Sequence, residues 1–121
     1  MGTMTALPGA SVSVSTGDVH APASATAAVV TYAAAGAGVS HVISGIAYSY
    51  LGVPTSGNLK IEDGSGNVIF SIDTGIAGAG VIAFPRPKKG SANTDMIITL
   101  GSGGVAVTGK VSVLNHWTEP S

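Results

Sequence analysis

Three histidines, His20, His41 and His116, are the residues of this chain best suited to nucleophilic or metal chemistry. A hydrolytic triad needs a serine and an acid around one of them, yet the chain has no G-x-S-x-G elbow and no motif that sets an acid beside a histidine. A metal site needs converging ligands, but the H-x-H and H-E-x-x-H spacings are absent and there is no cysteine. We therefore expect no enzyme activity, no cofactor and no metal. His41 and His116 would meet only if their strands paired.

The acidic residues are not spaced as a catalytic site either. Glu62 and Asp63 are neighbours, so on a strand they point to opposite faces and cannot act as the paired carboxylates of a glycosidase. The run 63–67 (DGSGN) begins like a calcium loop but lacks its remaining ligands, and a hairpin turn explains it better. Asp73 and Asp95 stand beside turns, where we expect them to accept hydrogen bonds from backbone amides.

Charge and hydropathy argue against two further classes of protein, nucleic-acid-binding proteins and membrane-spanning proteins. Charged residues make up 9% of the 121 residues and the formal net charge is −1. The basic cluster of Arg86, Lys88 and Lys89 lies in a Pro/Gly-rich stretch, too small for the electrostatic footprint of a nucleic-acid-binding protein. Mean hydropathy is high at +0.45, but no apolar run approaches the roughly 20 residues of a membrane span.

The first ten residues lack the basic and apolar regions of a signal peptide. A weakly charged, apolar surface favours contact with another protein.

The segments that must position these residues have the composition of β-strands. Val39–Leu51 is the longest run of strand formers, and we expect it to be the central strand, bent at Gly45 and with apolar groups on both faces. NLKIED and NVIFSID alternate around a glycine turn and predict a hairpin with one buried face. Further strands are expected at 27–35, at 81–84 with an end at Pro85, at 96–100, and at 105–117 with a bend at Gly109.

Seven or eight short strands separated by glycine turns predict an all-β fold of two packed antiparallel sheets. We expect a jelly-roll-like sandwich over residues 26–121, with a core of Val, Ile and Leu together with Tyr48, Tyr50, Phe70 and Phe84. Residues 1–25 are poor in bulky apolar groups and cannot fold alone, so they predict an extended N-terminal arm. Two readings of that arm stay open: a disordered tail, or a segment that orders against a partner. SVSVS, residues 11–15, alternates strictly and could add as an edge strand to this domain or to a neighbour.

Three stretches, taken together, resemble a known class of proteins. ISGIAYSY (43–50), SGNLKIEDGSGNVIFSIDTGIAGAGVIAFPRP (56–87) and NTDMIITLGSGGVAVTGKVSVLNHW (93–117) are similar to small structural proteins of tailed bacteriophages. The resemblance implies a jelly-roll sandwich that works as a capsid decoration, or cement, protein on the virion surface. It also implies a homotrimer, assembled in the bacterial cytoplasm, that bridges subunits of the major capsid protein.

In that role, the arm and the loops at one end of the sandwich would contact the capsid. We expect the contacts to involve Leu7, Val12, Val14, His20, Phe84, Pro85, Arg86, His116 and Trp117. Trp117 either plugs one end of the sandwich or anchors a subunit contact. The alternative function is a phage fibre, tail-associated or lectin-like module that binds a surface glycan. Tyr50, Trp117 and Asp95 would then have to meet in one platform.

Overall fold

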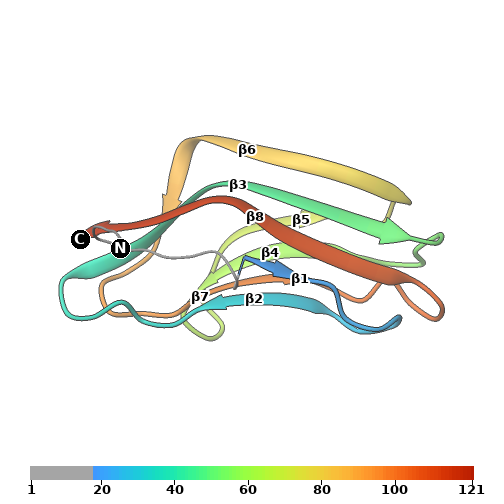
Figure 1. Cartoon of the computed structure of the whole chain (residues 1–121), viewed down its shortest axis with the longest axis horizontal. Helices are drawn as coiled ribbons and strands as arrows, with labels where there is room; N and C mark the ends of the chain where they lie inside the picture. Colours follow the sequence, from blue (N-terminus) through green and yellow to red (C-terminus); the bar gives the residue numbers. More distant parts are fainter. Residues whose placement is uncertain (1–17) are drawn as a thin grey trace, which may run out of the picture.

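The computed structural model describes residues 18–121, which form eight β-strands and no helix (Figure 1). The expected contacts at Leu7, Val12 and Val14 lie outside these residues. The strands are β1 (Val19–His20), β2 (Ala28–Tyr32), β3 (Val39–Leu51), β4 (Asn58–Asp63), β5 (Val68–Asp73), β6 (Gly78–Lys89), β7 (Met96–Leu100) and β8 (Thr108–Pro120).

The strands form two four-stranded sheets, in the orders β1-β8-β3-β6 and β2-β7-β4-β5. Every recorded pair is antiparallel. All consecutive strands except the β4–β5 hairpin lie in opposite sheets, and this order is that of an eight-stranded jelly roll. The prediction of an all-β, jelly-roll-like sandwich is confirmed.

The central strand has the predicted bounds, and its bend is a bulge. The pairing of β3 with both β6 and β8 shifts register between Ile43 and Gly45. Because an extra residue reverses the alternation of side chains, Ile43 before the bulge and Ile46 after it both join the core. On the outer face of the same strand, Ser40 and Val42 are also buried, so the expectation of apolar groups on both faces holds for this first part.

The core fills the space between the sheets with aliphatic side chains. Its fully buried members include Ile43 and Ile46 from β3, Leu59 and Ile61 from β4, and Ile98 from β7. Alternate residues of β4 and β7 are buried, the pattern of strands with one face on a core. The β4–β5 hairpin is confirmed, but its buried face holds for β4 only, because Val68 and Ile72 of β5 are 48% and 45% exposed.

The predicted bounds of three strands were wrong, and the first of them, 27–35, is the shorter β2 (Ala28–Tyr32). β6 continues past Pro85 to Lys89, whereas the sequence pattern ends it at Pro85. The prolines are tolerated because β6 is the edge of its sheet and its pairing with β3 is interrupted between Ala83 and Lys88. The last strand begins at Thr108 and runs to Pro120, rather than spanning 105–117.

The bend expected at Gly109 in the last strand is also misplaced. Gly109 pairs with Tyr50 in register, and the shifts of register lie where β8 passes Ile43–Ile46, around Leu114. Gly109 is needed for packing instead, because a Cβ there would approach the Leu100 side chain to 3.3 Å and the Tyr50 ring to 3.4 Å.

The sandwich also takes in part of the expected arm. Val19 and His20, which the sequence pattern assigns to residues 1–25, form β1 and pair with Ser112 and Val111 of β8. The amide of Ala25 donates a hydrogen bond to the carbonyl of Val107. Residues 18–25 therefore belong to the folded domain.

Candidate functional site

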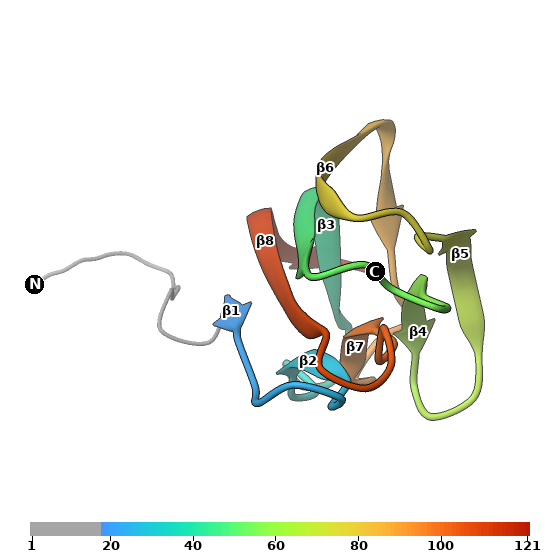
Figure 2. The ribbon, with the colours of Figure 1, turned by 90° about the vertical axis from the view of Figure 1, so that its right-hand side faces the viewer.

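Four loops meet at one end of the sandwich, which we call the loop end. They connect β1 to β2, β3 to β4, β5 to β6 and β7 to β8, and span residues 21–27, 52–57, 74–77 and 101–107. Because every strand pair is antiparallel, these connections fall at the same end, which faces the viewer in Figure 2. The opposite end holds the other three loops and the C-terminus (Figure 1).

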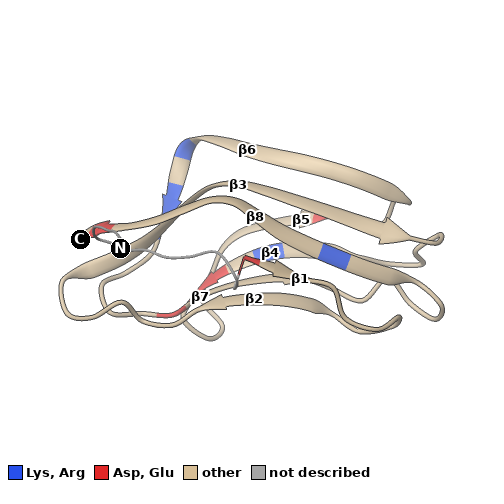
Figure 3. Cartoon of the chain, viewed as in Figure 1, with Lys and Arg blue, Asp and Glu red and all other residues tan. Residues whose placement is uncertain are grey.

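The four loops of the loop end carry no charge, and the charged residue that borders them directly is Asp73, the exposed last residue of β5. None of the five Lys/Arg and six Asp/Glu residues of the chain lies in its four loops. The charged residues lie instead along the strands and toward the opposite end (Figure 3). A partner that contacts only the four loops and Leu51 would therefore meet no ionic group that has to be desolvated, whereas one that reaches past loop 74–77 would meet Asp73.

The loop end also exposes large aliphatic side chains. The four most exposed large apolar residues of the described chain are Leu51 (77%), Val53 (80%), Ile76 (81%) and Val105 (90%). Leu51 ends β3 and the other three lie in three different loops. Scattered exposed apolar residues are normal on a protein surface, but the presence of these four at one end, beside four loops without charge, distinguishes the loop end from the rest of the surface.

Hydrogen bonds hold the loops of this end to one another. The Tyr50 hydroxyl donates to the Gly101 carbonyl at 2.6 Å, which ties β3 to the β7–β8 loop. Backbone bonds also link the loops: Thr55 N to Gly103 O at 2.8 Å, Gly101 N to Asn58 O at 2.7 Å, and Thr74 N to Gly57 O at 3.0 Å. A surface held in this way loses little conformational entropy when it binds.

Two glycines allow the loops to come this close. A Cβ at Gly57 would lie 2.5 Å from the Tyr50 hydroxyl oxygen, and one at Gly103 would lie 2.6 Å from a Val107 methyl group. Any side chain at either position would push the loops apart. The glycine content of these loops thus serves packing as well as turning.

A histidine pair lies toward the opposite end, between the sheets. His41 Nδ1 and His116 Nε2 are 2.9 Å apart, and His41 Nε2 lies 2.7 Å from the Ala33 carbonyl oxygen. Since a carbonyl only accepts, His41 donates from Nε2, and His116 must donate from its Nε2 to the His41 Nδ1. The Tyr32 ring stacks on His116 with centroids 3.7 Å apart, and its hydroxyl donates to Asp18.

The surroundings of this cluster shift two pKa values. Burial, and after it the neighbouring His41, lower the pKa of His116 to about 4, while Asp18 opposes the shift. Burial, the hydrogen bond to Asp18 and the charge of Asp18 all raise the pKa of Tyr32. Both side chains are therefore neutral at pH 7.

The cluster connects strands of the two sheets. It joins Tyr32 of β2, His41 of β3, His116 of β8 and Asp18 next to β1, and so ties the two sheets together. No group of three or more His, Cys, Asp or Glu side chains within residues 18–121 is arranged to hold a metal ion. We refer to these four residues as the histidine clamp.

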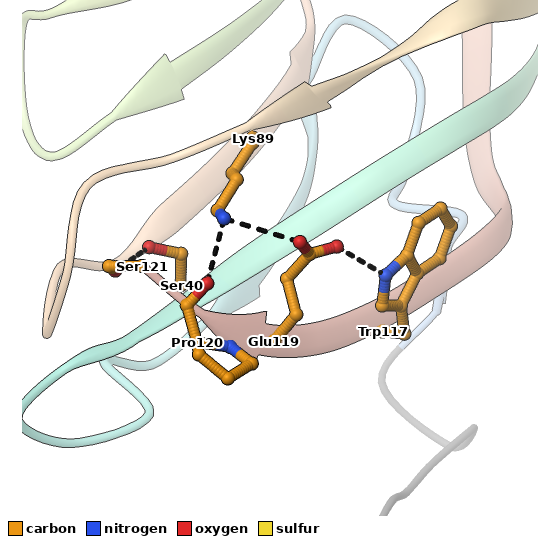
Figure 4. A network of polar contacts seen from close by, with 6 residues as sticks. All are labelled: Ser40, Lys89, Trp117, Glu119, Pro120 and Ser121. Carbon is orange, nitrogen blue, oxygen red and sulfur yellow. Dashed lines mark hydrogen bonds and ion pairs between the residues drawn. The ribbon is translucent and has the colours of Figure 1, made fainter.

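A second polar network fixes the C-terminus on the outer face (Figure 4). Trp117 Nε1 donates to Glu119 at 2.9 Å, and Lys89 pairs with the same carboxylate at 3.2 Å and donates to the Pro120 carbonyl at 2.7 Å. The Trp117 and Lys89 hydrogen bonds lower the pKa of Glu119. Trp117 therefore lies outside the core and does not plug an end of the sandwich, and its role as an anchor of a subunit contact stays a prediction.

The residues expected to contact a capsid do not gather at one place. Phe84 is buried and packs edge-on against Phe70, with centroids 4.9 Å apart, so its ring is not available to a partner. Pro85 and Arg86 are exposed on β6. His20 accepts a hydrogen bond from Val29 N at 2.9 Å, and His116 lies in the clamp.

The residues of the expected glycan platform are also kept apart. Tyr50 is buried and pairs with Gly109, whereas Trp117 pairs with Val42, eight residues earlier along β3. Eight strand residues span roughly 26 Å. Asp95 accepts a hydrogen bond from Ala34 N.

The surface that sequence reasoning missed is the set Leu51, Val53, Ile76 and Val105. Each lies beside a glycine, in stretches free of Lys, Arg, Asp and Glu, and that combination is a usable signal for exposed aliphatic tips. The meeting of His41 and His116, left conditional on strand pairing, is confirmed by β3 and β8 lying side by side.

Comparisons with known proteins do not place the chain in a family: no protein-family model matches it, and no curated protein and no solved structure shows significant similarity. Residues 18–121 include no helix able to cross a membrane.

Proposed function

We propose that this chain is a structural protein of a bacteriophage virion, a decoration protein that docks through its loop end on the major capsid protein. The observation that carries the proposal is the loop end, with its four uncharged, hydrogen-bonded loops and its four exposed aliphatic side chains. The resemblance of residues 43–117 to small tailed-phage structural proteins is the reason for proposing a capsid as the partner.

The mechanism is the burial of apolar surface against a shell. Fully burying one Val, Leu or Ile side chain contributes roughly 1.5–3 kcal/mol, so four of them can supply most of a micromolar interaction. The loops are already tied together, which lowers the cost of ordering them. Because the chain binds the assembled shell and not its separated subunits, mass action stabilises the closed particle.

The matching surface on the capsid protein should be apolar and uncharged. A charged partner would bury its own ions against Leu51 and Val105 without a counter-charge, since the four loops offer none. The glycan-binding alternative has less support, because Tyr50, Trp117 and Asp95 lie apart.

A trimer would present three loop ends to the shell at once, and the linked contacts would raise the overall affinity. Native mass spectrometry of the full chain at micromolar concentration should show the trimer. A strictly monomeric protein would remove this part of the proposal while leaving the docking surface intact.

The decisive experiment uses phage particles from a host that carries this coding sequence. Mass spectrometry of gradient-purified particles should find the chain at a fixed ratio to the major capsid protein. Its absence from every purified particle would refute the virion assignment.

Rebinding to particles that lack the chain then tests the surface. The double variant Leu51→Asp/Val105→Asp should bind at least about 100-fold more weakly, because two charges replace two buried aliphatic groups. Leu114→Asp is the matched control, since Leu114 is 56% exposed but lies on β8, away from the four loops. Equal binding by the double variant and the control would place the contact elsewhere.

A further inference from the structure

Two exposed charged side chains lie near the loop end without an ion pair inside residues 18–121. Lys110 lies on β8, two residues after Thr108, and Asp73 is the last residue of β5. Neither takes part in the ion pairs recorded for this part of the chain. Asp73 accepts a hydrogen bond from Asn58 Nδ2 at 3.2 Å, which leaves its charge uncompensated.

These two charges lie on opposite sides of the sandwich. β8 lies beside β1 in its sheet, and on that side the His20 ring of β1 is hydrogen-bonded to β2. β5 is the edge strand of the other sheet, on the side where Phe70 packs against Phe84 of β6. Figure 3 shows the blue segment of β8 and the red segment of β5 at about the same position along the strands. Lys110 and Asp73 are therefore level with each other but on different sides of the molecule.

An exposed valine accompanies Lys110. Val19 of β1 lies directly opposite Ser112 of β8 and is 54% exposed. Lys110 is two residues from Ser112 and shares its outer face, because Val111 between them is fully buried in the core. We call Val19, Lys110 and Ser112 the β8 patch.

Two exposed aliphatic side chains accompany Asp73. Ile72 precedes it on β5 and is 45% exposed, and Val81 of the other edge strand on this side, β6, is 69% exposed. Residues 78–84 of β6 include no charge and no proline, the features that commonly protect an edge strand from partners. We call Ile72, Asp73 and Val81 the β5–β6 patch. The two patches thus carry aliphatic groups together with charges of opposite sign.

We propose that a second copy of this chain covers these patches: the β8 patch of one copy binds the β5–β6 patch of the next, with Lys110 facing Asp73. A rotation about an axis parallel to the strands keeps every residue at its position along that axis, so residues that are level in one chain can meet between copies. Because the two patches differ and lie on opposite sides, the contact is heterologous and repeats until a ring closes. The loop ends of all copies then point the same way.

The inference rests on the homotrimer of the proposed function, but not on its capsid. A ring of three copies is that trimer, and it presents its three loop ends together. Asp73, the charge that borders the loop end, is then paired with a lysine when the loop end meets the shell.

The aliphatic and the charged groups act differently in this contact. Burial of Val19, Ile72 and Val81 supplies the affinity, since exposed ion pairs contribute little. The charges decide which patches meet, because like charges brought face to face repel. Reversing one charge should therefore weaken the contact, and reversing both should restore it.

Charge reversal in the full chain tests the pairing. Lys110→Glu and Asp73→Lys should each raise the dissociation constant of the trimer at least about tenfold, because each sets like charges face to face. The double variant should return to within about threefold of the original protein, since it restores opposite charges. Arg86→Glu is the matched control, an equal change of charge at an exposed site in the second half of β6, and should leave the constant unchanged. Sedimentation equilibrium at low salt measures these constants.

The outcomes separate this inference from the rest of the proposed function. A trimer whose double variant associates no better than the single variants would overturn the inference alone. A chain that is monomeric at micromolar concentration would overturn both the inference and the trimer, while particle binding through the loop end would still be measurable. Thermal denaturation checks that each variant is folded.

A cross-link in the unaltered chain needs no variant. A zero-length carbodiimide reagent should join Lys110 Nζ of one copy to the Asp73 carboxylate of another. Peptide mapping of mixed isotope-labelled and unlabelled chains should show that this link runs between chains, since the two residues lie on opposite sides of one chain. A trimer without this link, or one in which Lys110 is joined mainly to a different carboxylate, would contradict the inference.

Discussion

The two ends of the sandwich are built from different residues for different purposes. The four loops of the loop end have no charge, and this end exposes Leu51, Val53, Ile76 and Val105, while its loops are joined mainly through backbone atoms. The opposite end holds the histidine clamp and the Lys89–Glu119 network, and its polar side chains find partners inside the protein. At one end the polar side chains of residues 18–121 find partners within the fold, whereas the other end leaves four aliphatic side chains exposed, which the proposed docking would bury.

The largest effect on stability should come from breaking the clamp. His116→Ala leaves His41 Nδ1 buried without a donor and removes the ring stacked on Tyr32, so we expect a loss of about 2–4 kcal/mol in the free energy of unfolding. Urea denaturation measures it. His20→Ala is the control and should cost less, since that exposed ring makes one hydrogen bond to Val29. Particle binding by the folded fraction should be unchanged, because the clamp is remote from the loop end.

Acid should lower the free energy of unfolding through His116 of the histidine clamp, and this effect should be intermediate in size. The pKa of His116 is about 4 in the folded protein and about 6.5 when unfolded, so between these values the unfolded state binds more protons. The stability due to neutral His116 is complete above pH 6.5, is lost as pH falls toward 4 and changes no further below it. Since the ring is about half-exposed, we expect about 1–2 kcal/mol in all.

Denaturation midpoints at pH 7, 5.5 and 4 measure this acid sensitivity, and His116→Gln is the comparison variant. Glutamine still offers a donor for His41 but does not titrate, so its stability should fall less over this range. An identical acid response in both proteins would mean that a group other than His116 causes the loss of stability.

The smallest effect on stability should come from the loop end. Ile76→Asp and Val105→Asp alter side chains that are 81% and 90% exposed, so each should change the unfolding free energy by no more than about 0.5 kcal/mol. Thermal or urea denaturation checks this. A loss as large as that of His116→Ala would mean that the loop end supports the fold, and the contrast between the two ends would disappear.

Some elements of this fold can be predicted from local sequence, and others depend on the rest of the structure. Val39–Leu51 and the β4–β5 hairpin follow from strand-forming residues and glycine turns that lie close together in the chain. The sequence predicts a bend at Gly45 but not the shift of register, which lets Ile43 and Ile46 face the same core although strict alternation forbids it. The sequence pattern ends the strand at Pro85, because tolerance of a proline there depends on β6 being an edge strand, which only the fold decides.

The amino-acid sequence by itself determined the all-β class, the long middle strand and the absence of charge from four of the turns, since these depend on residue type and local alternation. Only the tertiary structure decided which residues would become neighbours. Leu51, Ile76 and Val105 are far apart in the chain, as are His41 and His116, and each group meets because of the order of strands in two sheets. That order is a global property of packing, and no stretch of sequence encodes it alone.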